Sequence, residues 1–176
     1  AALLVHGTLF QWHNKTMQEW WRPQSGDLHQ YLKNGTCSNL YANGDFYRWS
    51  GGFSDYAREE AAEKLVDWLH WRSIIAPNVV AHSHGCNVAM LASHSRPLNS
   101  LVMLSCPVHW DAYRPGQCAK VTSIRVKWDL VIMADRGAQR FPSSSGIVEH
   151  VLPFWFIGHK PHGSLPPGRL ETWTDS

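Results

Sequence analysis

Short runs of apolar residues recur along the chain, separated by turn residues or by segments with helical spacing. Such runs are typical of strands that are covered on both faces of a parallel sheet. They predict strands at residues 3–5, 79–81, 101–104, 122–126 and 151–157. Aromatic and polar residues mix over residues 39–49, where one further strand is expected. The last run contains Pro153, which cannot donate a ladder hydrogen bond, so this strand is expected at a sheet edge.

Helical spacing lies between these runs. Ser54 is suited to an N-cap, with Asp55 and Glu59 early in the helix, where acidic residues are favourable. An apolar stripe then continues to about residue 70, formed by Ala57, Ala61, Leu65, Trp68 and Leu69. Arg58 and Glu59 are expected on the solvent-exposed face of this helix. Shorter helical pieces are expected at residues 16–21, 27–32, 88–92 and 170–173. Strands that alternate with helices predict an α/β fold with a mainly parallel sheet.

Composition limits the classes of function. A chain of 176 residues with 44% hydrophobic and 17% charged residues is expected to form one globular domain over residues 1–176. The net charge of +2 gives no electrostatic reason to expect nucleic acid or an anionic membrane as a partner. No apolar run is long enough to predict a transmembrane span. The chain begins on a predicted strand without a signal-like segment. The compartment stays open, because a leader removed earlier would leave no trace.

Cysteine and histidine spacing gives little reason to expect a metal. Cys37, Cys86, Cys106 and Cys118 contain no C-x-x-C pair. Cys86 and Cys106 lie in apolar elements and are expected to be buried thiols. His82 and His84 flank a serine at a tight turn, where neighbouring side chains point apart, so a metal pair is not favoured. No cofactor is expected.

The most informative turn is Ala81-His82-Ser83-His84-Gly85, which follows an apolar strand and precedes an apolar helix. A sharp strand-to-helix turn exposes a serine hydroxyl and aims a helix N-terminal N–H at developing negative charge. Such a turn requires small residues two positions before and after the serine, as Ala81 and Gly85 are. Ser83 is therefore a candidate nucleophile.

Three other polar residues also follow predicted strands. Thr8 comes after the first strand and the turn His6-Gly7, Asp129 follows residues 122–126, and His159 follows residues 151–157. Ligands of parallel sheets bind beyond the carboxyl ends of the strands, so these residues and Ser83 are expected at one rim. A serine hydroxyl needs a base to take its proton, and a histidine base needs an acid to orient it.

The chain resembles compact α/β-hydrolases of the bacterial lipase and esterase kind. The resemblance rests on Leu-Val-His6-Gly7, on Ala-His-Ser83-x-Gly, on Asp129-Leu-Val and on Gly-His159-Lys-Pro-His162. It implies a Ser83–Asp129–His159 catalytic triad. It also implies an oxyanion hole made by the backbone N–H groups of Thr8 and His84.

The strand that ends in His-Gly is normally third in the sheet of this family. The resemblance therefore implies a minimal fold of about six mainly parallel strands, with helices on both faces. The short interval after Leu104 leaves no room for a cap domain, which predicts an open pocket.

Several assignments remain open. Asp135 is an alternative acid to Asp129, and His162 is an alternative base to His159. His6 is expected to support its loop through hydrogen bonds rather than to act in catalysis. Four aromatic residues in loops are candidate walls of an acyl pocket, or else ordinary core or surface residues: Phe10, Trp12, Trp110 and Tyr113.

The expected function is hydrolysis of small-molecule carboxylic esters through an acyl-enzyme, without a cofactor. A thioesterase or acyltransferase would use the same triad. A non-catalytic binding protein with the hydrolase fold is the third hypothesis. The presence of both the serine and the histidine counts against it.

Overall fold

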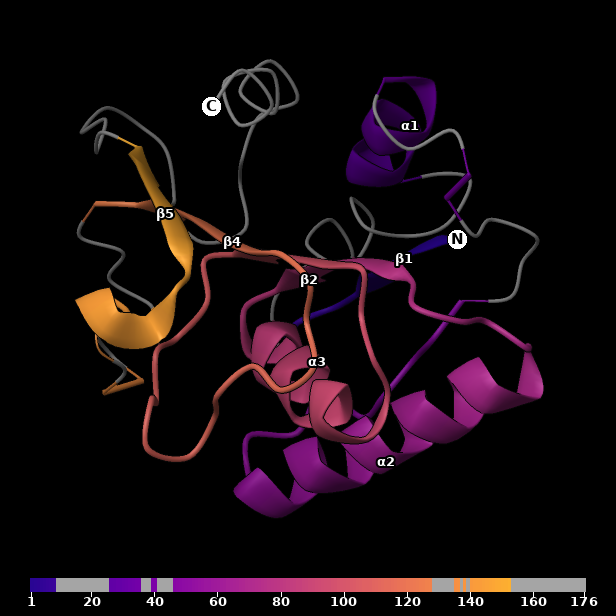
Figure 1. Cartoon of the computed structure of the whole chain (residues 1–176), viewed down its shortest axis with the longest axis horizontal. Helices are drawn as coiled ribbons and strands as arrows, with labels where there is room; N and C mark the ends of the chain where they lie inside the picture. Colours follow the sequence, from indigo (N-terminus) through magenta and orange to yellow (C-terminus); the bar gives the residue numbers. More distant parts are fainter. Residues whose placement is uncertain are drawn as a thin grey trace.

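Five parallel strands form one sheet in the computed structural model, which describes residues 1–8, 26–35, 39–40, 46–127, 135–136, 138 and 140–152. The sheet order follows the chain, β1-β2-β3-β4-β5 (Figure 1). The strands are β1 (Ala2–Val5), β2 (Asn78–His82), β3 (Ser100–Leu104), β4 (Val121–Val126) and β5 (Val148–Leu152). The α/β class with a parallel sheet is therefore confirmed.

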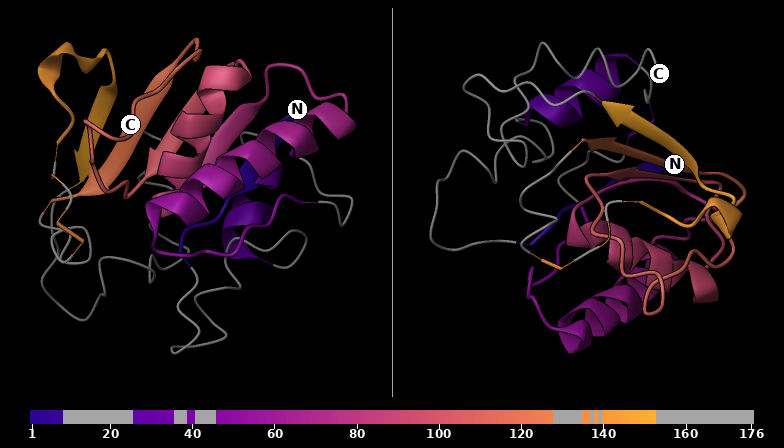
Figure 2. Two further views of the ribbon diagram at one scale, coloured as in Figure 1. Left: turned by 90° about the horizontal axis from the view of Figure 1, so that it is seen from below. Right: turned by 90° about the vertical axis from the view of Figure 1, so that its left-hand side faces the viewer.

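Helices cover both faces of the sheet (Figure 2). The helices α2 (Asp55–Trp71) and α3 (His84–Ser95) pack on one face, and α1 (Asp27–Asn34) packs on the other. A short 3-10 helix, η1, spans Ser143–Ser145. Alternate strand residues serve the two faces, since Val79 belongs to the core under α2 and α3 while Val80 belongs to the core under α1.

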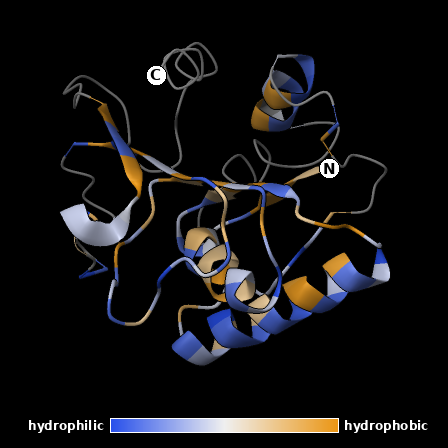
Figure 3. Ribbon diagram, viewed as in Figure 1, coloured by the Kyte–Doolittle hydropathy of each residue, from blue (hydrophilic) through white to orange (hydrophobic). Residues whose placement is uncertain are grey.

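The predicted start of α2 is confirmed, because the Ser54 side chain accepts a hydrogen bond from the Ala57 N–H at 3.1 Å. Its buried stripe includes Ala61, Leu65 and Leu69, whereas its outer side is hydrophilic (Figure 3). Helix α3 lies between α2 and the sheet and is buried along most of its length. The start of the helix that follows Ser83 is thus buried in the core.

The first three strands end within one residue of one another, and β4 runs two residues further, to Val126. His82 of β2 pairs with Leu104 of β3, which pairs with Ile124 of β4. On the first strand Val5 pairs with Ala81, so the turn after β1 and the turn after β2 lie at the same edge of the sheet. Of the four residues expected at one rim, Thr8 and Ser83 therefore lie there, whereas Asp129 and His159 lie outside the described residues.

The predicted start of the last strand is wrong. The last strand, β5 (Val148–Leu152), begins at residue 148 rather than at residue 151, and it lies at an edge of the described sheet as expected. Residues 153–157 of the predicted strand lie outside the described residues. Its start was missed because Glu149 and His150 interrupt the apolar pattern. Glu149 faces the buried guanidinium of Arg125 on β4 at 3.3 Å, so a polar pair occupies this sheet position.

The strand expected within residues 39–49 is reduced, in the described part of that segment, to an isolated bridge between Ala2 and Leu40. The described residues contain five strands, and a sixth is not among them. Residues 105–120, which join β3 to β4, contain no helix or strand. The helices expected at residues 16–21 and 170–173 lie outside the described residues. Among the helices that the structure describes, none has both the length and the apolar character needed to cross a bilayer.

Candidate functional site

Ser83 joins β2 to α3 in a strained backbone conformation. Its φ of 53° and ψ of −133° are uncommon for a residue with a side chain. Its N–H donates to the carbonyl of Leu104 at 2.9 Å, and its own carbonyl accepts from the N–H of Cys86 at 2.9 Å. Such strain persists only where the surrounding structure imposes it, and it is concentrated at functional sites. The turn predicted around Ser83 therefore has the sharp geometry that its small neighbours indicated.

Gly85 lets the first turn of α3 pass directly against the end of β1. A methyl group at this position would stand 2.3 Å from the carbonyl oxygen of His6 and 2.7 Å from that of Val5. Both obstacles are backbone atoms, which cannot rotate away. The glycine that follows Ser83 by two residues is thus required by packing between the two turns.

We expect Gly85→Ala to lower the free energy of unfolding by about 3 kcal/mol or more, because the methyl group would push α3 away from β1. Gly146→Ala is the matched control, since a methyl group there meets no atom within 4 Å and only the φ of 71° opposes it. That control should cost about 1 kcal/mol. Urea unfolding of both variants measures the difference, and equal losses would contradict the packing argument.

The turn after β1 also touches Ser83. A methyl group at Gly7 would lie 2.8 Å from the Cβ of Ser83, so the backbone that leads into Thr8 runs beside the nucleophile candidate. The N–H of His84, as the first residue of α3, has no acceptor within its helix. The hydroxyl oxygen of Thr8 is buried and has no hydrogen-bond partner.

His6 holds this turn in place, as expected. Its side chain is buried, and its Nδ1 lies 2.7 Å from the carbonyl oxygen of Gly7, to which it must donate. Its Nε2 accepts from the backbone N–H of Trp49 at 3.2 Å, while the Trp49 indole N–H donates to the His6 carbonyl at 2.8 Å. The imidazole therefore links β1 to the segment before α2 in its neutral form.

Acid should weaken the fold through His6. Burial lowers the pKa of His6 to about 4. The His6 imidazole is therefore protonated below about pH 6.5 in the unfolded chain but stays neutral down to about pH 4 in the folded chain. The free energy of unfolding should therefore fall between pH 6.5 and pH 4, by about 3 kcal/mol from this group. Urea unfolding at pH 7 and pH 4 should show a smaller loss in His6→Gln than in the wild type. The exposed His70→Gln serves as the control, and identical pH dependence in all three proteins would refute the assignment.

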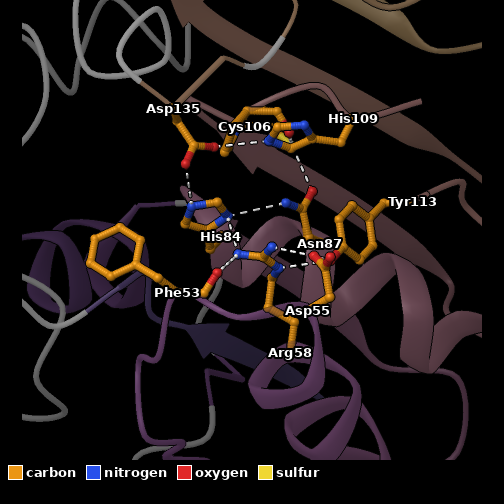
Figure 4. Close-up of polar contacts among 10 residues, drawn as sticks. Phe53, Asp55, Arg58, His84, Asn87, Cys106, His109, Tyr113 and Asp135 are labelled. Atoms are coloured by element: carbon orange, nitrogen blue, oxygen red, sulfur yellow. Dashed lines mark hydrogen bonds and ion pairs between the residues drawn. The ribbon is translucent and has the colours of Figure 1, made fainter. Parts of the chain in front are cut away.

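The side chain of His84 lies in a polar cluster that sequence reasoning missed (Figure 4). Arg58 was expected to be exposed, but its side chain is only 8% exposed and contacts His84. The sequence did contain a signal of this burial. Arg58 precedes the buried Ala61 by three residues and the buried Ala62 by four, so the three residues lie on the same side of α2.

Asp135, the alternative acid to Asp129, also belongs to this cluster. One carboxylate oxygen lies 3.3 Å from Nε2 of His84 and the other lies 2.9 Å from Nε2 of His109. The two imidazole rings stack with their centroids 6.4 Å apart. His109 was not singled out from the sequence, because nothing in its local pattern marks it.

Two candidate pocket walls can be placed. Tyr113 is buried, and its hydroxyl donates to Asp55 and accepts from the Arg58 side chain at 2.8 Å. Trp110 is half-buried, and its ring meets that of Phe141 edge to face at 6.0 Å. Tyr113 therefore attaches the β3–β4 connection to α2, and Trp110 attaches it to Phe141. These contacts leave open the role of either residue as a wall of an acyl pocket.

The other assignments fall outside the described residues. These are Asp129 and His159 of the expected triad, the alternative base His162, and the pocket candidates Phe10 and Trp12. Cys37 is outside as well. Cys86 and Cys106 are buried free thiols, as expected, and burial raises the pKa of Cys106. Within the described ranges, no three His, Cys, Asp or Glu side chains are grouped as metal ligands would be.

No protein-family model matches the chain, and no curated protein matches it. The functional inference therefore rests on the chain itself, and its centre is the strained serine between β2 and α3.

Proposed function

We propose that the protein is a serine hydrolase that cleaves carboxylic esters through an acyl-enzyme. The observation that carries this proposal is the φ of 53° at Ser83, a buried serine at a strand-to-helix turn on the carboxyl edge of a parallel sheet. Evolution tolerates strain at a serine where its hydroxyl must be presented to a substrate.

The surroundings of Ser83 support the same chemistry. A tetrahedral intermediate needs N–H donors aimed at its oxyanion. The N–H of His84 lies at the positive end of α3, and the backbone of the Gly7–Thr8 turn runs beside Ser83. In this proposal these two backbone amides, of Thr8 and His84, form the oxyanion hole.

The proton transfers are assigned to His159 and the orienting role to Asp129. The Ser83 oxygen attacks the ester carbonyl while His159 accepts its proton and then delivers it to the departing alcohol. Water hydrolyses the acyl-enzyme by the reverse sequence of proton transfers. Asp129 is preferred to Asp135 because both carboxylate oxygens of Asp135 already face other imidazoles.

A fluorophosphonate probe tests the proposal directly, since the activated serine oxygen displaces fluoride and becomes covalently phosphonylated. We expect a single labelled site, Ser83, identified by mass spectrometry of the digested protein. A panel of p-nitrophenyl esters and the matching thioesters, graded by acyl length, then identifies the substrate class. Absence of both labelling and turnover in the folded protein would refute the hydrolase assignment.

A further inference from the structure

The imidazole of His84 is enclosed by polar groups from three other segments of the chain (Figure 4). Its side chain is 4% exposed. Arg58 of α2 contributes a guanidinium nitrogen 3.3 Å from Nδ1, and Asp135 contributes a carboxylate oxygen 3.3 Å from Nε2. The Asn87 amide lies 3.2 Å from Nδ1, and the His109 ring stacks on the imidazole. The side chain adjacent to the proposed nucleophile is thus fixed from several directions.

These contacts select one tautomer. Arginine has only donors, so the Nδ1 that faces Arg58 must be the unprotonated, accepting nitrogen. The proton of a neutral imidazole then sits on Nε2, where it is donated to the Asp135 carboxylate. A proton on Nδ1 would place two donors against each other, and in the imidazolium form it would also place two positive charges against each other. Arg58 therefore opposes both the other tautomer and the imidazolium form.

Arg58 is itself held rigidly. Its Nε donates to the Tyr113 hydroxyl at 2.8 Å, and one terminal nitrogen donates to the Phe53 carbonyl at 2.7 Å. Its other terminal nitrogen pairs with Asp55. A buried guanidinium is tolerated only when its donors are satisfied, as they are here. Its position against His84 is consequently defined by α2 and by the connection between β3 and β4.

We propose that Arg58 is a positioning residue that locks His84 in the Nε2–H tautomer and thereby fixes both the His84 backbone N–H, next to Ser83 in the chain, and the Asp135 carboxylate that faces Nε2. The consequence for catalysis rests on the proposed function, because it matters only if the His84 N–H binds an oxyanion. The tautomer itself does not depend on any activity.

The tautomer can be read from the wild-type protein alone. In a two-bond proton–nitrogen correlation spectrum, bare and protonated imidazole nitrogens resonate far apart, and His84→Gln identifies the signals of His84. We expect a bare Nδ1 and a protonated Nε2 throughout the neutral range. A protonated Nδ1 would overturn the proposal without reference to any variant of Arg58.

The charged and titratable groups that face His84 are Arg58, Asp135 and His109. Burial lowers the pKa of His84, Arg58 and His109 lower it further, and Asp135 opposes them. Arg58→Met removes the cation and keeps the length of the side chain, so the His84 titration should move to higher pH. Lys64→Met, on the exposed face of the same helix, should leave it unchanged. Equal titration of His84 in both variants would overturn the proposal.

Ester hydrolysis supplies the kinetic readout. Arg58→Met should lower kcat by about ten- to a hundredfold with little change in KM, and the acid limb of kcat should move to higher pH with His84. Arg58→Lys keeps the charge but not the planar fork, so it should retain the His84 titration and recover only part of kcat. If the protein hydrolyses no ester, the spectra still decide the tautomer. If it does, an unchanged kcat in Arg58→Met would overturn the positioning role.

Discussion

Ser83→Ala should abolish ester hydrolysis, lowering kcat by about 10⁴- to 10⁶-fold, as is typical when the nucleophile of a triad is removed. The fold should survive, because alanine has the same Cβ and leaves the backbone contacts of residue 83 with Leu104 and Cys86 in place. Labelling by the fluorophosphonate probe should disappear with the activity. Circular dichroism and urea unfolding establish that the variant is folded.

Ser105→Ala is the matched control for this experiment. Ser105 is also a buried serine with a positive φ, 48°, and it follows β3 at the same edge of the sheet. Backbone strain, burial and the edge of the sheet are therefore shared, whereas Ser105 precedes no helix and has no proposed role in catalysis. We expect Ser105→Ala to hydrolyse esters at close to the wild-type rate. Turnover retained in Ser83→Ala, or lost equally in both variants, would remove the assignment of Ser83 as nucleophile.

His159→Ala should be nearly inactive, with kcat lowered by about 10⁴-fold or more, whereas His162→Ala should lose only about tenfold. The physical reason is that a serine oxygen is a weak nucleophile until a base takes its proton, while a histidine that only shapes a loop affects positioning. Steady-state kinetics of the two variants on one soluble ester decide the ranking. Both histidines lie outside the described residues, so this remains a prediction from the sequence.

The position of the last strand bears on that ranking. The expectation for His159 assumes a strand that continues to residue 157, and β5 is described over Val148–Leu152. The residues that follow Leu152 lie outside the described part of the chain, so the kinetics of the two variants decide which histidine acts as the base. Strong loss in His162→Ala with activity retained in His159→Ala would transfer the role of base to His162.

Patterns of neighbouring residues predicted the strands β1 to β4 and the helix α2, which depend on interactions close together in the sequence. Continuous apolar runs indicated β1 to β4 within one or two residues, because strands buried on both faces admit few polar side chains. The Ser54 cap and the apolar stripe indicated α2, because capping and helical spacing also depend on residues close together in the sequence. The start of β5 was missed where Glu149 pairs with Arg125, since a cross-strand ion pair leaves no mark in either local pattern.

The sequence by itself determined the parallel α/β class and the serine turn, because small residues around Ser83 and apolar residues on either side are local requirements of that turn. Only the tertiary structure decided which polar residues meet there. Arg58, His109 and Asp135 come from three segments that are distant along the chain, and no local pattern shows that they meet. They gather around His84 because parallel strands bring the segments that follow them to one edge of the sheet, while α2 packs against α3.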